Sequence, residues 1–463
     1  MSKSPNQINI DSMQTRMSDV ELKFSSPTVC TAKWLQSTIY LMNGHTHSCH
    51  HPSTHKIPLE EIQRNVNAIH NTEHKKVARK EMLSGIQTKE CGYCWNIENS
   101  GNNISDRTYK SEDPNWSYPF LDRIDEAGST GDIDPTYLEV AFDNTCNFKC
   151  MYCTPDISSK WMEEIEQFGP YKVGIGDLTW IKLMDKMPIP NREHNPYVDA
   201  FHEWFPKVKN KLTNFRITGG EPLLSKSLWR VFDELIENPE PNLTIGINSN
   251  MDVPSEIIDK FISYVIRLKD KVKSIELYTS AEAHGIQAEY IRYGMKYERF
   301  IKNITKYLDR TDSSSRVNFM ITFNALSLTS FTRFLDDIYN LRIKYNEDDA
   351  ENRVPFMISY LRWPLFQDAR VLPSDIKLKF IDQIVQFMQD RDRTHSSNPA
   401  GRFYLEEIDQ AERLRNYIMT DIPPGELATL QSNFRSFYRE YDSRRGVNFM
   451  TTFPEYREFY LLP

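Results

Sequence analysis

Long apolar runs are missing from this sequence. No stretch reaches the roughly 18 apolar residues that a transmembrane helix needs. The polar start, MSKSPNQINIDSMQTRMSDVELKF, also lacks the apolar centre of a secretory signal. We therefore expect a cytoplasmic protein without a membrane partner.

An excess of basic residues is missing too. Lys and Arg number 56 against 64 Asp and Glu, which gives a net charge of −8. A protein whose main partner is DNA or RNA needs a basic surface to neutralise phosphates. The charge balance argues against a nucleic-acid-binding module, the class that a Cys- and His-rich N-terminal region would otherwise suggest. We therefore expect no nucleic-acid partner.

Cysteine is scarce. The chain has seven, an odd number, and they occur in clusters. Cytoplasmic thiols stay reduced. An odd, clustered set therefore favours metal or redox chemistry over a framework of disulfides.

The chain has 463 residues, long enough for roughly two to four domains. Its composition changes along four segments. We expect a flexible polar tail at 1–26, a cysteine-rich region at 27–128, a core of alternating strands and helices at 129–365, and a helical extension at 366–463.

Six short runs rich in β-branched and aromatic residues alternate with helical segments in the third part. They are YLEVAFDN (137–144), NFRITGG (214–220), LTIGINSN (243–250), SIELYTS (274–280), RVNFMITFN (316–324) and PFMISYLRW (355–363). This alternation predicts parallel βα units. Six units rather than eight predict an α/β fold with a partial (β/α)6 TIM-like barrel. Chemistry in such sheets gathers at the carboxyl ends of the strands, which here are polar or glycine-rich.

Three cysteines, Cys146, Cys150 and Cys153, follow the first of these strands. Structural zinc takes four ligands, whereas this loop offers three thiols and no nearby histidine. An iron–sulfur cubane takes one thiolate per iron. Three thiolates would leave one iron open to a small chelating cofactor.

The segment CNFKCMYC (146–153) resembles the cluster-binding motif of the radical S-adenosylmethionine superfamily, including the aromatic Tyr152 before the last cysteine. ITGGEPLL (217–224), at the end of the next strand, resembles the family's glycine-rich methionine-binding motif. The resemblance implies a [4Fe–4S] cluster on the three cysteines, which form the catalytic centre. There, S-adenosylmethionine is cleaved to a 5′-deoxyadenosyl radical that abstracts hydrogen from the substrate.

Further cofactor-binding residues follow from the same resemblance. Gly219 and Gly220 let the backbone approach the cofactor, and Glu221 adds charge to that contact. Ser280 and, twelve residues later, Arg292 match a spacing in the peptide-modifying and sulfatase-maturing branch, where they would contact the ribose and carboxylate. In that branch the serine is usually followed by Asp-Gly, whereas here it is followed by Ala-Glu.

Asn250 resembles the asparagine at the end of that branch's third strand. By resemblance, it is a further candidate for contact with the cofactor.

The other four cysteines, Cys30, Cys49, Cys91 and Cys94, precede the expected barrel. Gly44, between the first two, suits a hairpin turn that folds one cysteine back toward the other. CGYC (91–94) has the spacing of a metal knuckle, so four thiols in two pairs make a closed site. Zinc is one candidate occupant, and HTHSCHHPSTH (45–55) places five histidines around the second cysteine.

The spacing of Cys30, Gly44 and Cys49 also resembles the opening of the auxiliary-cluster region called SPASM, or twitch in its shorter form. The family usually carries this region after the barrel, whereas here it comes first. The resemblance, shared with uncharacterised twitch-containing radical proteins of bacteria and phages, implies a second [4Fe–4S] cluster in place of zinc.

These motifs imply a radical S-adenosylmethionine enzyme with oxidoreductase-like chemistry, in which the second cluster assists oxidation. We expect a peptide or protein side chain as substrate, because this branch is dominated by such substrates. A small polar molecule such as a sugar or cyclitol is the alternative. A non-catalytic zinc- or cluster-bearing binding protein is the alternative from another class. The enzyme would need a reducing partner such as flavodoxin or ferredoxin.

Overall fold

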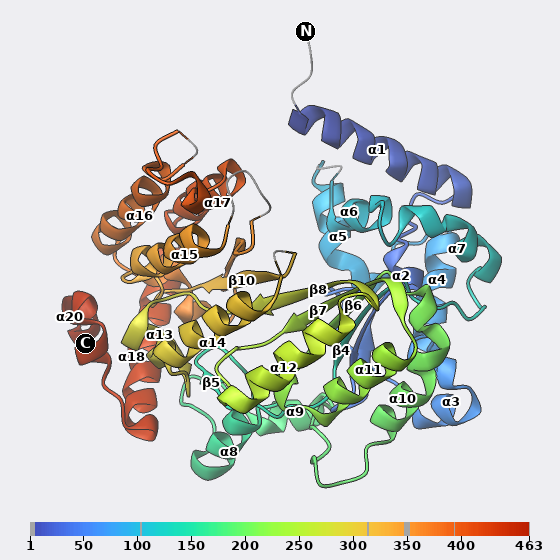
Figure 1. The fold of residues 1–463 in the computed structure, drawn as a ribbon, viewed down its shortest axis with the longest axis horizontal. Helices are drawn as coiled ribbons and strands as arrows, with labels where there is room; N and C mark the ends of the chain where they lie inside the picture. The colour runs from blue at the N-terminus through green and yellow to red at the C-terminus, as the bar shows by residue number, and fades with distance from the viewer. Residues whose placement is uncertain (1–4, 102–103, 313, 347–351, 393, 463) are drawn as a thin grey trace.

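The predicted strands come together in one nine-stranded sheet in the computed structural model, which describes residues 5–101, 104–312, 314–346, 352–392 and 394–462. The strand order is β11-β10-β8-β7-β6-β4-β1-β2-β3. Figure 1 shows the sheet at the centre, with the N-terminal helices on one side and the C-terminal helices on the other.

All six predicted strands are present and neighbour one another in chain order. They are β4 (Tyr137–Ala141), β6 (Asn214–Thr218), β7 (Glu240–Asn248), β8 (Val272–Thr279), β10 (Arg316–Phe323) and β11 (Phe356–Tyr360). Each pairs in parallel with the next. The predicted α/β fold with a parallel sheet is therefore confirmed, while closure into a partial barrel stays a prediction.

The sheet extends further than predicted. β1 (Gln36–Tyr40) pairs in parallel with β4 and antiparallel with β2 (His45–His47), which pairs with β3 (His55–Lys56). Gly44, with φ at +67°, forms the predicted turn between β1 and β2. The cysteine-rich segment thus continues the central sheet across the boundary expected at residue 128.

The two faces of the sheet differ in polarity. Along β10, Val317, Phe319 and Ile321 are buried, and the residues between them are half-exposed. Helices α11 (Lys226–Glu237), α12 (Ser255–Leu268) and α14 (Tyr297–Arg310) lie along the apolar face (Figure 1). The face with the half-exposed residues is called the inner face below.

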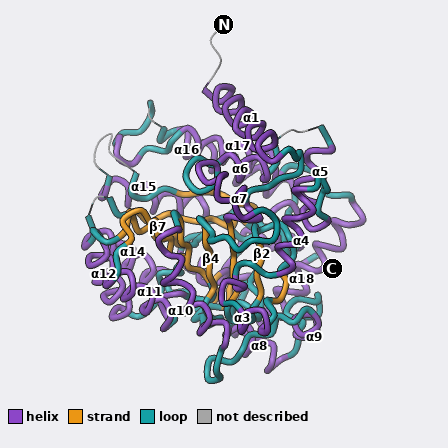
Figure 2. Tube along the Cα trace, turned by 90° about the vertical axis from the view of Figure 1, so that its right-hand side faces the viewer, coloured by secondary structure: helices purple, strands orange, loops and turns teal. Residues whose placement is uncertain are grey.

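Other helices surround the strands (Figure 2). In the central segment these are α8 (Ser159–Phe168), α9 (Leu178–Leu183), α10 (Pro196–Val208), α13 (Gly285–Ile291) and α15 (Phe331–Tyr345). The cysteine-rich segment contributes α2 (Ala32–Leu35), α3 (Leu59–Arg64), α4 (Glu73–Leu83), α5 (Gly92–Asn99), α6 (Asp106–Glu112) and α7 (Leu121–Ala127).

The expected flexible tail is a helix over most of its length. Residues 5–24 form α1 (Pro5–Phe24), which lies beside α6 (Figure 1). Met13, Met17 and Val20 are buried. The prediction was wrong for these residues because three apolar side chains at helical spacing anchor an otherwise polar segment. Residues 1–4 of the tail lie outside the described residues.

The predicted helical extension is confirmed. It consists of α16 (Ser374–Gln389), α17 (Leu405–Ile418), α18 (Pro424–Arg445), α19 (Phe449–Thr452) and α20 (Arg457–Leu461). Among the described residues, no helix has the length and apolar character needed to cross a membrane.

Candidate functional site

The three-cysteine loop follows β4 at the carboxyl edge of the sheet, as predicted. Cys146, Cys150 and Cys153 are half-buried free thiols. Burial raises the pKa of all three thiols, and the neighbouring Cys150 raises the pKa of Cys146 and Cys153 further. The three sulfurs therefore lie close enough to interact electrostatically, which suits a shared metal cluster.

Two flanking helices hold this loop through its backbone. Trp161 on α8 donates its indole N–H to the carbonyl of Cys150 at 2.6 Å. Arg445 at the end of α18 donates to the carbonyl of Lys149 at 2.7 Å and pairs with buried Glu164 at 3.0 Å. The C-terminal extension thus supports the three-cysteine loop directly.

Arg292, predicted from sequence resemblance alone, lies against the same loop. The short strands β5 (Lys149–Cys150) and β9 (Arg292–Tyr293) pair antiparallel, with Cys150 opposite Arg292. One guanidinium N–H of Arg292 points at the Cys150 sulfur at 3.8 Å. A cation in this position favours the thiolate, and it lowers the pKa of Cys150 against the effect of burial.

The guanidinium of Arg292 is also ion-paired. Glu282, 1% exposed, accepts from its Nη2 at 2.6 Å and its Nε at 3.0 Å. The Tyr152 hydroxyl bridges them, donating to Glu282 at 3.0 Å and accepting from Arg292. The Ala-Glu departure from the family pattern therefore supplies the partner of the arginine. From the sequence alone, Glu282 had no predicted role.

The glycine pair of ITGGEPLL lies against the three-cysteine loop. Gly219 has φ at +126°, and a Cβ there would lie 2.9 Å from the Asp143 carbonyl oxygen. A Cβ on Gly220 would lie 2.3 Å from the Thr145 carbonyl oxygen, and the Glu221 N–H donates to that oxygen at 2.7 Å. The glycine pair therefore allows the chain after β6 to approach the chain after β4 closely. The prediction was that these glycines let the backbone approach the cofactor, and it did not include this contact between the two segments.

Glu221 is turned into the protein. Its carboxylate accepts from the backbone N–H of Asn250 at 2.6 Å, the N–H of Leu223 at 3.0 Å and the hydroxyl of Ser249 at 2.8 Å. Burial raises its pKa to about 7 despite these bonds. Here it ties the end of β6 to the end of β7.

The two remaining predicted residues lie at the same edge. The Asn250 side chain donates to Asn147, inside the three-cysteine loop, at 2.8 Å. Ser280 follows directly after β8 and is half-exposed. The structure thus brings every residue predicted around the cofactor to the carboxyl edge of one sheet.

The other four cysteines also come together, although 64 positions of sequence separate the first from the last. Cys30, Cys49, Cys91 and Cys94 are all buried and line one small cavity. Cys91 raises the pKa of each of the other three thiols electrostatically, although burial has the larger effect. The donor set and the shared cavity suit a bound metal group.

Basic side chains stand around this cavity. Lys33, Arg107 and Lys110 line it. Lys33 is buried and pairs with Glu90, while Arg107 pairs with Glu98 at 2.9 Å. The charges of Lys33 and Arg107 act on Cys49 and Cys30, respectively. Sequence reasoning did not identify these cations, because no local pattern connects them with the cysteines.

No group of three or more His, Cys, Asp or Glu side chains in the described parts of the chain is arranged to hold a single metal ion.

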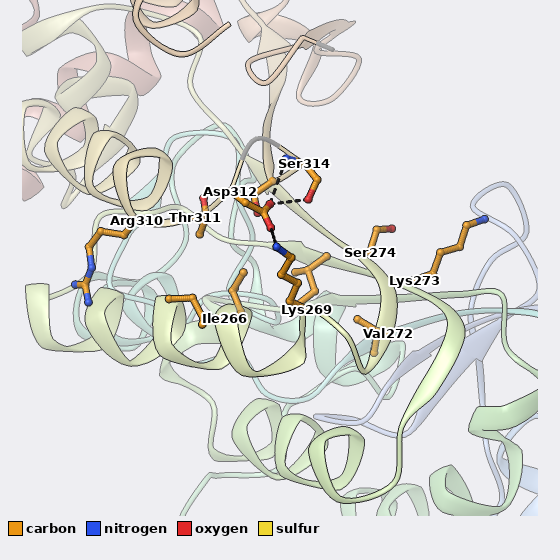
Figure 3. A pocket seen from close by; sticks show the side chains of 12 residues that line it. Ile266, Lys269, Val272, Lys273, Ser274, Arg310, Thr311, Asp312 and Ser314 are labelled. Carbon is orange, nitrogen blue, oxygen red and sulfur yellow. Dashed lines mark hydrogen bonds and ion pairs between the residues drawn. The ribbon is translucent and has the colours of Figure 1, made fainter. Parts of the chain in front are cut away.

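A separate surface pocket lies between the end of α12, the start of β8 and the end of α14 (Figure 3). Lys269 and Asp312 form an ion pair of 2.7 Å across it. It is at the amino end of β8, away from the cysteine loop.

Comparisons with known proteins agree with the motifs. No family model matches the chain. The GTP 3′,8-cyclase of Campylobacter lari is 21% identical over 278 residues, which cover 58% of this chain and 69% of that protein. The GTP 3′,8-cyclase of Nautilia profundicola is 25% identical over 114 residues, 25% of this chain and 27% of that protein.

Among solved structures, Streptococcus suis SuiB bound to its precursor peptide SuiA aligns with 80% of this chain and 71% of its own at 12% identity. The TM-score is 0.35, too low to define a shared fold. The two motifs, placed together at one sheet edge, and the similarity to the two cyclases support the resemblance to the radical S-adenosylmethionine superfamily.

Proposed function

We propose that this protein is an enzyme that uses a [4Fe–4S] cluster on Cys146, Cys150 and Cys153, together with S-adenosylmethionine, to abstract hydrogen from an organic substrate. When bound, these cofactors supply one-electron cleavage and a carbon radical. The observation that carries the proposal is the convergence of the three thiols with the glycine turn and Arg292 at one edge of the sheet.

The surrounding residues have defined tasks in this proposal. Arg292 presents planar donors that suit a carboxylate, and Glu282 supplies one in this structure. Gly219 and Gly220 bring the ends of β4 and β6 into contact, which fixes the loop that carries the thiols. Arg445 and Trp161 hold the same loop through the carbonyls of Lys149 and Cys150.

We further propose that Cys30, Cys49, Cys91 and Cys94 hold a second [4Fe–4S] cluster that assists oxidation. Four thiols around one cavity satisfy a cubane, in which each iron takes one thiolate. Zinc is the alternative occupant. A reductant such as flavodoxin or ferredoxin would supply electrons to the enzyme.

Two substrate classes follow from this chemistry. A peptide or protein side chain is the class expected from the resembling branch. A small polar molecule is the second candidate, and the polar inner face of the sheet favours it.

Metal content tests the proposal. Anaerobically reconstituted protein should bind about eight irons, the sum of two four-iron clusters. Replacing Cys146, Cys150 and Cys153 with Ala should remove half of the iron and all 5′-deoxyadenosine formation. Replacing Cys91 and Cys94 should remove the other half. Zinc bound stoichiometrically in that second site would contradict the auxiliary-cluster proposal.

A further inference from the structure

A row of polar residues crosses the inner face of the sheet. Direct register partners place Thr38 of β1 beside Glu139 of β4, Glu139 beside Arg216 of β6, Arg216 beside Gly246 of β7, and Gly246 beside Glu276 of β8. These five residues are called the inner row. Central strands covered on both faces carry near-continuous apolar runs, so polar groups here need an explanation.

Part of the inner row already has partners. Arg216 donates to the Asn248 side chain at 2.9 Å and stacks over the Tyr278 ring at 4.4 Å. Gly246 makes this possible, because a Cβ there would lie 3.2 Å from the Tyr278 ring. Arg216 is thereby fixed, with its guanidinium on the inner face.

The other end of the inner row lacks partners. The Thr38 hydroxyl is buried without a hydrogen bond, and so is the side-chain carbonyl of Gln36, which lies on the same face of β1. In the described part of the chain, no hydrogen bond or ion pair reaches the Glu139 carboxylate, and burial raises its pKa. Buried polar groups are normally hydrogen-bonded, so the Thr38 and Gln36 side chains are poised for a ligand, and the half-exposed Glu139 carboxylate lies beside Thr38 on the neighbouring strand.

The position of the row suits a substrate. Arg216 lies three residues before Gly219, so the row is about 10 Å below the edge that carries the cysteine loop. Lys110, which lines the four-cysteine cavity, also acts electrostatically on Glu139. A ligand on the row would therefore lie between the two cysteine sets.

We propose, resting on the function proposed above, that Thr38, Glu139 and Arg216 bind the substrate and that it is a small, uncharged molecule with several hydroxyl groups. Acceptor and donor side chains alternate along the row, and a hydroxyl group is both donor and acceptor. The two charged residues of this set, Glu139 and Arg216, have opposite charges, so the set carries no net charge that would attract a strongly charged ligand.

The span of the row favours a small molecule with several hydroxyl groups over a peptide side chain as the ligand. Neighbouring strands are about 4.8 Å apart, so Thr38, Glu139 and Arg216 extend over about 10 Å. A polyol carries several hydroxyl groups around its carbon skeleton, whereas an amino-acid side chain usually carries its polar atoms in one group at its end.

Calorimetric titration of the reconstituted protein tests this, with myo-inositol, D-glucose and the capped tripeptide Ala-Ser-Ala as probes. At least one polyol should bind with Kd below about 1 mM. Glu139→Gln and Thr38→Val should each weaken it about 10-fold or more, because each removes a hydrogen bond to the ligand. Glu237→Gln, on the exposed surface of α11, is the matched control and should bind as the wild type does.

The ligand-free protein gives an independent readout. Glu139→Gln should raise Tm, because it removes a carboxylate that has no donor, whereas loss of a structural residue would lower Tm. Failure of both polyols to bind, unchanged binding by the Glu139 and Thr38 variants, or binding of the tripeptide that depends on these residues would overturn the proposal. Titration does not require S-adenosylmethionine cleavage, so an inactive protein that binds a polyol would contradict only the function proposed above.

Discussion

Cys150 and Arg292 face each other across a two-stranded sheet, with the guanidinium 3.8 Å from the sulfur. The two residues are 142 positions apart in the chain. Their pairing connects the cluster motif with the segment after β8, and Glu282 holds the arginine in that position.

Arg292→Lys should lower the free energy of unfolding by about 2–4 kcal/mol. Lysine cannot keep two parallel bonds to Glu282, and the buried carboxylate is left incompletely paired. Urea unfolding measures the change. Arg310→Lys, in an exposed pair with Asp259, is the control and should change stability by less than about 0.5 kcal/mol. Equal effects of both substitutions would contradict a buried role for Arg292.

Gly220→Ala should destabilise the protein by about 2–3 kcal/mol and displace the cysteine loop. The added methyl group would lie 2.3 Å from the Thr145 carbonyl oxygen, a backbone atom that has no room to move. The measurements are urea unfolding and iron bound at the first site. At Gly425, near the start of α18, a Cβ would meet nothing within 4 Å, so Gly425→Ala should be neutral or slightly stabilising. Full iron binding by Gly220→Ala would contradict the role given to the glycine pair.

Stability should depend on pH through Glu221. Its pKa is raised from 4.5 to about 7 in the folded protein, so the folded state binds more protons than the unfolded state between these values. The free energy of unfolding should therefore fall by about 3 kcal/mol as pH rises from 4.5 to 7. Urea unfolding at several pH values measures this slope. It should flatten in Glu221→Gln and persist in Glu237→Gln; an identical slope in both variants would show that other groups cause it.

Lys33→Met should lower the reduction potential of a cluster bound by the four N-terminal cysteines. The buried ammonium lines their cavity and favours added negative charge, as its effect on Cys49 shows. A shift on the order of 50 mV is expected, since about 1.4 kcal/mol corresponds to 59 mV for one electron. A redox titration followed by electron paramagnetic resonance measures it. Lys89→Met, on the exposed surface nearby, should leave the potential unchanged.

The central strands could be predicted because their signal is local. Apolar and β-branched residues recur with period two between turn residues, and each such run became a strand at nearly the predicted position. β1 was missed because QSTIY at 36–40 has little apolar periodicity. Its pairing with β4 depends on a contact about 100 positions away, which no local pattern reports.

In the candidate site, too, some residues could be predicted from a local sequence pattern, and others could be found only from the fold. The order and spacing of the cysteines and of the GGEP motif predicted which residues gather at the sheet edge. Glu282 had no role in that prediction, because only the fold brings Tyr152 and Arg292 to it. Met13, Met17 and Val20 did carry a helical signal within the tail, but three residues among many polar ones were too few to outweigh its composition.

The most direct test of the central claim is S-adenosylmethionine cleavage. Reconstituted, reduced protein should convert S-adenosylmethionine to 5′-deoxyadenosine without oxygen, as followed by mass spectrometry. Cys150→Ala should abolish this product, whereas the double variant Cys91→Ala, Cys94→Ala should still form it. Wild-type protein with a complete cluster on Cys146, Cys150 and Cys153 that never consumes S-adenosylmethionine, with or without candidate substrates, would contradict it.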